Sequence, residues 1–243
     1  MTQAARGATI IVVALLTVAA AACGARTGGR SGNGYQVATF RAASGASAQD
    51  VAARITGARA DIVLLSAERD SAWFSAVSEG AGLELSGPGL TGDIGMAFLT
   101  NLEVLGDTSL VLSVPEGGSV HMHDALYRVD RSRMIDLMIV RFDAPDLRAA
   151  VRRLFSYIAT DVGASVAVLL AIDAPTVQLA DSAAVLMRAH YGNALECAGD
   201  DIGAGERGPV RLLYGPSARL SCISARALPG DPPGVTAGVI LQR

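Results

Sequence analysis

The sequence predicts one α/β domain in which two mainly antiparallel sheets pack face to face and the helices lie outside. Three observations support this fold class. Apolar runs of strand length alternate with amphipathic stretches from residue 35 onward. Several strand-like runs follow one another in the middle of the chain, separated by turn residues, which is typical of hairpins. The 243 residues are 51% hydrophobic, which is enough to bury a full core.

The first half of the domain reads as two strands that alternate with two helices. "YQVATF" is a strand, and "SAQDVAARITGA" is a helix that Ser47 can cap, with Val51 and Ile55 on one face. "ADIVLLS" is apolar on both faces, so we expect a central strand. "DSAWFSAVSEGAG" is a second helix that begins at Asp70 and ends at a glycine.

The middle of the chain reads as a run of hairpins, and the last part as strands and helices. Four strands are predicted in "DIGMAFLT", "TSLVLSV", "DALYRV" and "MIDLMIVRF". "DLRAAVRRLFSYIATD" is a helix with Leu147, Val151, Leu154 and Ile158 in one stripe. A buried strand in "SVAVLLAIDAP" ends on Asp173, and a helix follows in "QLADSAAVLMRAHY". The closing strands are "PVRLLYG", "RLSCISARAL" and "VTAGVIL".

The N-terminus has the features of an export signal. Arg6 precedes a short apolar run, and small residues lead to Cys23, so residues 1–22 are predicted to be a signal peptide. The Ala-Ala-Ala-Cys ending resembles the lipobox of bacterial lipoproteins, in which the cysteine carries lipid. Residues 23–34 then form a Gly/Ser-rich tether before a domain at 35–243. We expect an exported, membrane-anchored lipoprotein of the bacterial cell envelope; the alternative is an ordinary signal peptide or an uncleaved anchor.

Charge and cysteine content limit the classes of partner. The net charge is −3 and the chain has no basic run, so nothing in the sequence indicates nucleic-acid binding. Cys197 and Cys222 remain in the exported chain. They form a disulfide, which an oxidising compartment would preserve, or they stay two separate buried thiols.

The order of the strand motifs resembles the endonuclease/exonuclease/phosphatase superfamily, which includes DNase I, exonuclease III and sphingomyelinases. The resemblance runs from about Val37 to Leu241. Its matching segments are "VATFRAASG", "ADIVLLSAE", "IGMAFLT", "LMIVRFDAP", "VAVLLAIDAP", "VRLLYGPSARL" and "GDPPGVTAGVIL". The resemblance implies a DNase I-like four-layer sandwich and, in active members, metal-dependent hydrolysis of phosphoric esters.

Two of the metal-binding positions of that superfamily hold other residues in this chain. Arg41 stands where the opening asparagine is expected, and Ala67 stands at the position of the metal-binding glutamate. Glu68 follows one step later and is a candidate metal ligand if the strand has already ended there. An arginine in this cavity would place a positive charge where the charge of the metal belongs.

The remaining catalytic positions are also incomplete. Asp173 matches an aspartate of the superfamily, but Pro175 replaces its asparagine partner. Asp231 matches the terminal aspartate, but Pro232 replaces the histidine that exchanges protons. Leu213 stands where a further aspartate is expected. Asp173 and Asp231 are therefore interpreted as vestigial candidates for catalytic residues.

Two functions follow from this pattern. The first is a lipid-anchored domain that lacks catalysis and cofactor, and that binds or scaffolds an unknown protein or small-molecule ligand. The alternative is a diverged Mg²⁺-dependent phosphoesterase that uses a displaced cluster of carboxylates, from Glu68, Asp70, Asp143, Asp173 and Asp231. His121 and His123 are interpreted as exposed hairpin residues, and a metal site built on this pair is the other option.

Overall fold

A computed structural model describes residues 34–91, 94–162, 166–190, 195–197, 207–216 and 218–242. The predicted signal peptide, Cys23 and the tether up to residue 33 lie outside the described residues, and Gly34, the last residue of the predicted tether, begins the first strand. All of the described residues belong to one compact unit. No helix in the described part of the chain is long and apolar enough to cross a membrane.

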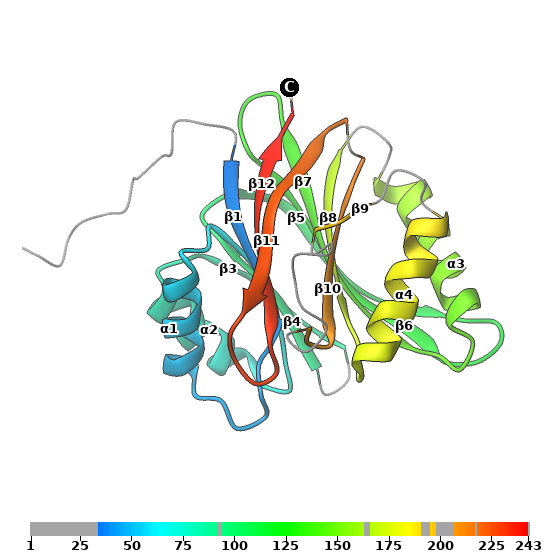
Figure 1. Ribbon diagram of the computed structural model, residues 1–243, viewed down its shortest axis with the longest axis horizontal. Helices are drawn as coiled ribbons and strands as arrows, with labels where there is room; N and C mark the ends of the chain where they lie inside the picture. The colour runs from blue at the N-terminus through cyan, green and yellow to red at the C-terminus, as the bar shows by residue number, and fades with distance from the viewer. Residues whose placement is uncertain are drawn as a thin grey trace, which may run out of the picture. The chain divides into compact units, whose positions relative to one another are not determined.

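The described residues form two six-stranded sheets, and the first is built from both ends of this part of the chain (Figure 1). Its strand order is β11-β12-β1-β2-β4-β3. The bounds are β1 Gly34–Arg41, β2 Ile62–Ala67, β3 Leu85–Thr91, β4 Ile94–Thr100, β11 Leu220–Leu228 and β12 Gly234–Leu241. β1 and β2 are parallel, and the other neighbours are antiparallel.

The second sheet comes from the middle of the chain and has the order β5-β6-β7-β8-β10-β9. The bounds are β5 Glu103–Ser113, β6 Ser119–Arg128, β7 Met134–Asp143, β8 Ala167–Asp173, β9 Leu195–Glu196 and β10 Val210–Gly215. β7 and β8 are parallel, and the other neighbours are antiparallel. Both sheets are thus mainly antiparallel, as predicted.

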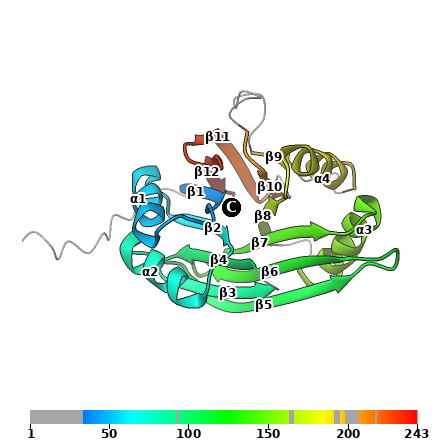
Figure 2. The same cartoon turned by 90° about the horizontal axis from the view of Figure 1, so that it is seen from below.

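Helices cover the outer face of each sheet, so the domain has four layers (Figure 2). The helices α1 (Ala48–Ala58) and α2 (Ser71–Ala81) pack on the first sheet. The helices α3 (Leu147–Tyr157) and α4 (Val177–His190) pack on the second, and a short π-helical turn, η1 (Ile158–Val162), extends α3. The predicted fold class is confirmed.

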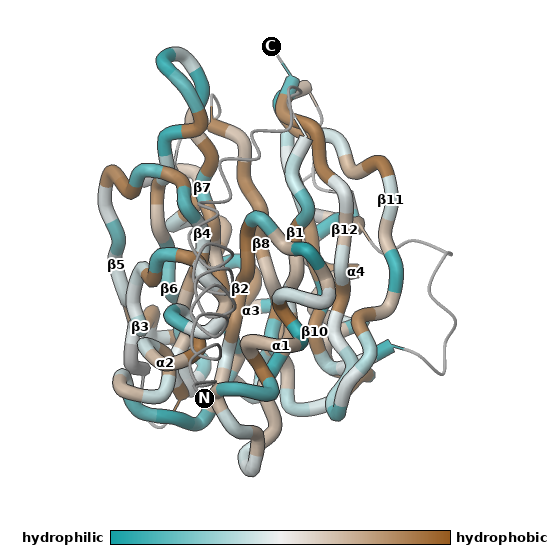
Figure 3. The backbone as a smooth tube through the Cα atoms, turned by 90° about the vertical axis from the view of Figure 1, so that its left-hand side faces the viewer, coloured by the Kyte–Doolittle hydropathy of each residue, from teal (hydrophilic) through white to brown (hydrophobic). Residues whose placement is uncertain are grey.

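A large core cluster lies between the two sheets, where Val37, Leu64 and Phe98 of the first meet Leu137 and Leu169 of the second. We call this cluster the inter-sheet core. Figure 3 shows hydrophobic residues in the central strands and hydrophilic ones in the connecting turns. Successive residues of a strand point to opposite faces of the sheet. The residues before and after each inter-sheet residue in the sequence therefore face a helical layer.

Local sequence signals explain where several helices begin. The Ser47 side chain accepts a hydrogen bond from the Asp50 amide, and the Asp70 side chain accepts one from the Trp73 amide. Val151 and Leu154 of the predicted stripe on α3 are fully buried, and Ile158 is nearly so. The position of Asp70 as a helix cap assigns this residue a structural role.

A disulfide joins the two sheets at their edges. Cys197 follows β9 of the second sheet and Cys222 lies on β11 of the first, and their sulfur atoms are bonded. Of the two alternatives for these cysteines, the structure contains the bridge.

Candidate functional site

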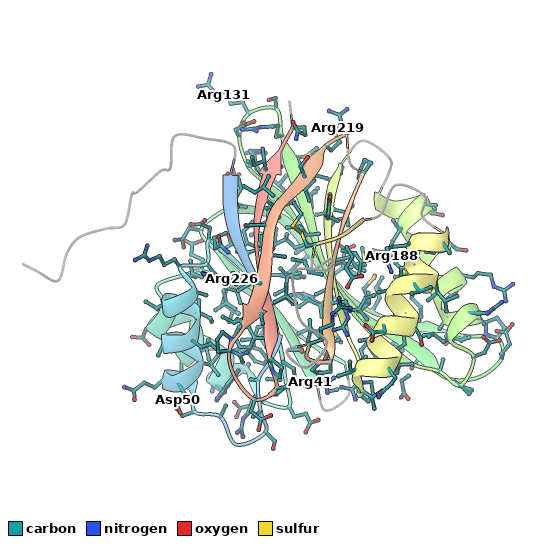
Figure 4. All side chains as sticks on the ribbon, viewed as in Figure 1. Arg41, Asp50, Arg131, Arg188, Arg219 and Arg226 are labelled. Carbon is teal, nitrogen blue, oxygen red and sulfur yellow. A yellow bond between two sulfur atoms is a disulfide. The ribbon has the colours of Figure 1, made fainter. Side chains whose placement is uncertain are left out.

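Two arginines and one buried aspartate meet at one end of the sandwich. Arg41 ends β1, Asp173 ends β8, and Arg141 lies near the end of β7. Nη2 of Arg41 is 2.5 Å from Oδ1 of Asp173, and Nη1 of Arg141 is 3.9 Å from Oδ2. Arg41 therefore forms an ion pair across the interface between the two sheets. Figure 4 shows Arg41 toward the end of the sandwich opposite Arg131 and Arg219.

Strand alternation explains why these three side chains converge. On β7, Ile135, Leu137 and Ile139 belong to the inter-sheet core, so Arg141 points to the same face. On β8, Leu169 and Ala171 do so, and Asp173 is the next residue on that face. The parallel pairing of Val140 with Ile172 then sets Arg141 beside Asp173. Arg141 does not stand at any of the superfamily positions compared above, so the sequence comparison did not identify it. The period-two pattern of its strand could have identified it.

The charges at this site are largely withdrawn from water. Asp173 is 1% exposed, while the side chains of Arg41 and Arg141 are 19% and 21% exposed. Burial raises the pKa of Asp173, and the two arginines and the nearby Ser66 hydroxyl oppose that increase. Burial lowers the pKa of Arg141, and Asp173 opposes that decrease. Each charge is therefore stabilised mainly by its partners.

The side chain that the end of β2 presents to the site is not that of Ala67, which stands at the position of the superfamily's metal-binding glutamate. Ala67 is buried against the helical layer, in the cluster that contains Phe74 and Val77 of α2. Ser66 lies opposite Arg41 in the parallel pairing, and its hydroxyl is close enough to Asp173 to favour the ionised carboxylate and so lower the pKa of Asp173. The side chain that reaches the site from β2 is thus Ser66, because Ala67 points to the other face.

Glu68 lies just beyond β2 and is exposed to solvent. Its carboxylate is close enough to Arg141 to raise the pKa of that arginine, as is the exposed carboxylate of Asp143. Both carboxylates therefore interact electrostatically with Arg141 at the rim of the site. Their surroundings differ from those of Asp173, which is buried between the sheets.

The remaining positions that the sequence comparison with the superfamily identified lie around this end of the domain or on another face of it. Pro175 is exposed in the connection between β8 and α4. Leu213 is buried on the outer face of the second sheet, in the cluster formed with α3 and α4. Asp231 is exposed in the turn between β11 and β12. In the same turn, Arg54 of α1 donates a hydrogen bond to the carbonyl of Pro232 at 3.2 Å.

The two histidines of β6 differ from the expectation of exposed hairpin residues. His123 is 2% exposed and stacks on Phe98, with ring centroids 4.8 Å apart. Its Nδ1 is 2.9 Å from Oγ of Ser109, and burial lowers its pKa. Nε2 of His121 is 2.9 Å from Oγ of Ser119. The prediction of exposure is wrong for His123, because β6 lies between two other strands and turns this residue toward the core.

The residues at this end do not fit the divalent cation that the superfamily implies. Mg²⁺ binds through oxygen ligands, usually including one or two carboxylates. Here the guanidinium of Arg41 contacts the buried carboxylate of Asp173, and Ala67 points away from it. Within the described residues, no three side chains of His, Cys, Asp or Glu gather as a metal-binding group would.

Solved structures of known proteins share this fold, although their sequences are only distantly similar to this chain. No family model matches the chain, and no curated protein matches it either. An endonuclease/exonuclease/phosphatase from Bacteroides vulgatus is 14% identical with a TM-score of 0.67, covering 86% of this chain and 99% of its own.

Two further solved structures have the same fold at low identity. A mannosyl-6-phosphatase from Bacteroides thetaiotaomicron is 10% identical with a TM-score of 0.63, covering 86% of this chain and 100% of its own. D. rerio TDP2, solved with a single-strand DNA product, is 9% identical with a TM-score of 0.64, covering 85% and 98%. The described domain therefore has the DNase I-like fold of the endonuclease/exonuclease/phosphatase proteins, as the strand motifs predicted.

Proposed function

We propose that this domain lacks catalysis and acts in binding or scaffolding, held at the bacterial cell envelope by a lipid on Cys23. The ion pair between Arg41 and Asp173 is the observation that carries this proposal. A guanidinium is a fixed cation of very high pKa that donates hydrogen bonds and cannot activate a water molecule as a metal ion does. It neutralises the one buried carboxylate that a catalytic mechanism would need.

Hydrolysis of a phosphoric ester also requires a group that delivers a proton to the leaving oxygen. Pro232 occupies the position where the superfamily has its proton-transferring histidine, and a proline side chain has no proton to give. Pro175 likewise offers no amide to orient water. The residues of this site therefore supply hydrogen-bond donors and charge without a proton relay.

Binding is the activity that such a site retains. Arg41 and Arg141 come from different sheets, and each keeps about a fifth of its side chain exposed beside Asp173. They are partly restrained by the ion pair, which lowers the entropy cost of engaging a ligand. The ligand is an unknown protein or small molecule at the envelope, and nothing in the composition favours nucleic acid.

The test is an assay for metal-dependent hydrolysis. We expect the purified protein to leave bis-p-nitrophenyl phosphate intact with Mg²⁺ or Mn²⁺, and to show the same melting temperature with and without millimolar metal. Metal-dependent hydrolysis that disappears in Asp173→Ala would instead establish the alternative, a diverged phosphoesterase. A metal-dependent rise in melting temperature that depends on Glu68 or Asp231 would support the same alternative.

The lipid anchor has its own test, because it depends on a different part of the chain. In a bacterial host that processes lipoproteins, the protein should incorporate labelled fatty acid and sediment with membranes. Cys23→Ala should abolish both behaviours, while Cys222→Ala keeps the label on the membrane-bound protein. A soluble, unlabelled wild-type protein would contradict the anchor and leave the hydrolysis test unaffected.

A further inference from the structure

A second polar cluster lies on the opposite side of the second sheet from Asp173, next to the α3 layer. On β7, Ile135 and Leu137 point into the inter-sheet core, so Asp136 between them points outward. On β6, Ala125 faces the core and Asp124 faces outward. The two aspartates lie on neighbouring strands and on the same face. Asp136 of β7 is paired with Leu126 of β6, and Asp124 is two residues from Leu126.

The two carboxyl groups are in hydrogen-bond contact, and a tyrosine fixes one of them. The hydroxyl of Tyr157, at the end of α3, donates to Oδ2 of Asp124 at 2.9 Å. Asp136 hydrogen-bonds to Asp124, is 3% exposed, and has no hydrogen-bond partner for its Oδ1 among the described residues. A buried carboxyl oxygen without a partner is costly, so a group that donates to it would be stabilising.

These carboxyl groups line a hollow of about 260 Å³. Its walls are apolar on several sides, through Leu105, Leu126 and Val166. Asp107 and Thr108 of β5 also line the hollow. The Asp107 carboxylate itself turns to the other face, because Asp107 is paired with the core residue Ala125 and accepts a hydrogen bond from Ser86 of the first sheet at 2.9 Å. The hollow thus combines an acidic floor with apolar walls.

The acidic pair shares a proton when the hollow holds no cation. Burial raises the pKa of Asp136 to about 10, and the neighbouring Asp124 adds to this increase. At neutral pH Asp136 is therefore the protonated partner that donates to Asp124, and the pair carries a single negative charge. A cation that enters the hollow can replace that proton without changing the net charge of the cluster.

We propose that this hollow binds a small organic cation with a primary ammonium group and an apolar tail. The ammonium has three N–H donors, which suit Oδ1 of Asp136 and the carboxylate of Asp124. Leu105, Leu126 and Val166 cover the tail. A bare divalent ion would need several more oxygen ligands, whereas within the described residues no third carboxylate or histidine joins this pair as a metal ligand.

Binding is an exchange of two cations. The ammonium enters with its positive charge, Asp136 releases its proton to the buffer, and no covalent bond forms or breaks apart from that O–H bond. This proposal uses neither Arg41 nor Asp173, so it does not depend on the binding role assigned to the other end of the domain.

The experiment compares n-butylammonium with n-butanol, which has the same tail and no charge. At about ten times its dissociation constant, n-butylammonium should raise the melting temperature of the full chain by about 3–6 °C. Asp136→Asn keeps the shape of the side chain and removes its ionisation, so it should weaken binding roughly tenfold or more. Asp130→Asn, at an exposed acid in the turn after β6, is the matched control and should bind like the wild type.

Calorimetry in two buffers of different ionisation enthalpy supplies a second readout. The wild type should show a buffer-dependent binding enthalpy near neutral pH, because a proton is released, and Asp136→Asn should show none. The proposal is overturned if n-butanol binds as well as n-butylammonium, if neither binds, or if Asp136→Asn binds unchanged. It is equally overturned if Ca²⁺ or Mg²⁺ stabilises the protein through Asp136 and the amine does not.

Discussion

Removing the guanidinium of Arg41 tests whether the ion pair with Asp173 holds the two sheets together. Loss of one partner of a buried ion pair costs about 3–5 kcal/mol, because the other charge is left buried without compensation. The Arg41 side chain is 19% exposed and Arg141 remains 3.9 Å from the carboxylate, so the cost should be smaller. We expect Arg41→Ala to lower the free energy of unfolding by about 2–3 kcal/mol at pH 7.

For a domain of this size, that loss corresponds to a fall of about 4–12 °C in melting temperature. The effect should also depend on pH in a defined direction. Burial raises the pKa of Asp173 above its ordinary value of 3.8, so the folded state holds this proton more tightly than the unfolded chain. The stability that protonated Asp173 contributes is fully present below pH 3.8, and it is lost as the pH rises through the raised pKa. Without Arg41 this loss should be larger, and the difference from the wild type should grow toward neutral pH.

The assay is urea unfolding at several pH values, with an exposed ion pair as the control. Arg128 and Glu103 are paired at 2.9 Å with 46% and 60% of their side chains exposed, so Arg128→Ala should cost less than about 1 kcal/mol. The double variant Arg41→Ala with Asp173→Asn should recover part of the loss, because the buried carboxylate is gone and only the partly exposed Arg141 remains charged. An Arg41→Ala variant as stable as Arg128→Ala, or one whose deficit is the same at pH 4 and pH 8, would refute this reasoning.

Two further predictions concern His123 and the disulfide. Burial lowers the pKa of His123 below its ordinary value of 6.5, so stability should fall as the pH drops below 6.5, where the unfolded chain binds the proton more readily. His123→Gln should flatten that part of the pH profile in urea titrations, and an unchanged profile would show that other groups cause it. The Cys197–Cys222 bridge spans 25 residues, and by loop-closure entropy it should contribute about 3.5 kcal/mol. The double variant Cys197→Ala with Cys222→Ala should lose about that free energy of unfolding, whereas a loss below about 1 kcal/mol would contradict the estimate.

The sequence predicted most elements of the fold because their signals are local. The apolar strands around Leu64 and Leu169 and the stripe on α3 each follow a period that burial imposes. β3 was not among the predicted strands. Its Ser-Gly-Pro-Gly stretch, residues 86–89, breaks the strand pattern, and a proline is tolerated there because β3 lies at the edge of its sheet.

The site was harder to predict than the fold, since its contacts join residues far apart in the chain. Motif matching pointed to Arg41 and Asp173 one at a time, and neither position states that the two form an ion pair. Matching also singled out Ala67 and Leu213, whose side chains the strand pleat turns toward the helical layers. Arg141 has no motif of its own and becomes visible only from the face that its strand presents.

The two sheets share one connection pattern, in which a parallel pair crosses over through a helix: β1-α1-β2 in the first and β7-α3-β8 in the second. Arg41 and Asp173 belong to different copies of this pattern, so neither copy alone contains both charges. The native contact therefore requires the strand order of both sheets and their docking in register. A spectroscopic probe placed at this contact would report the docking of the two sheets and would not report the formation of either one alone.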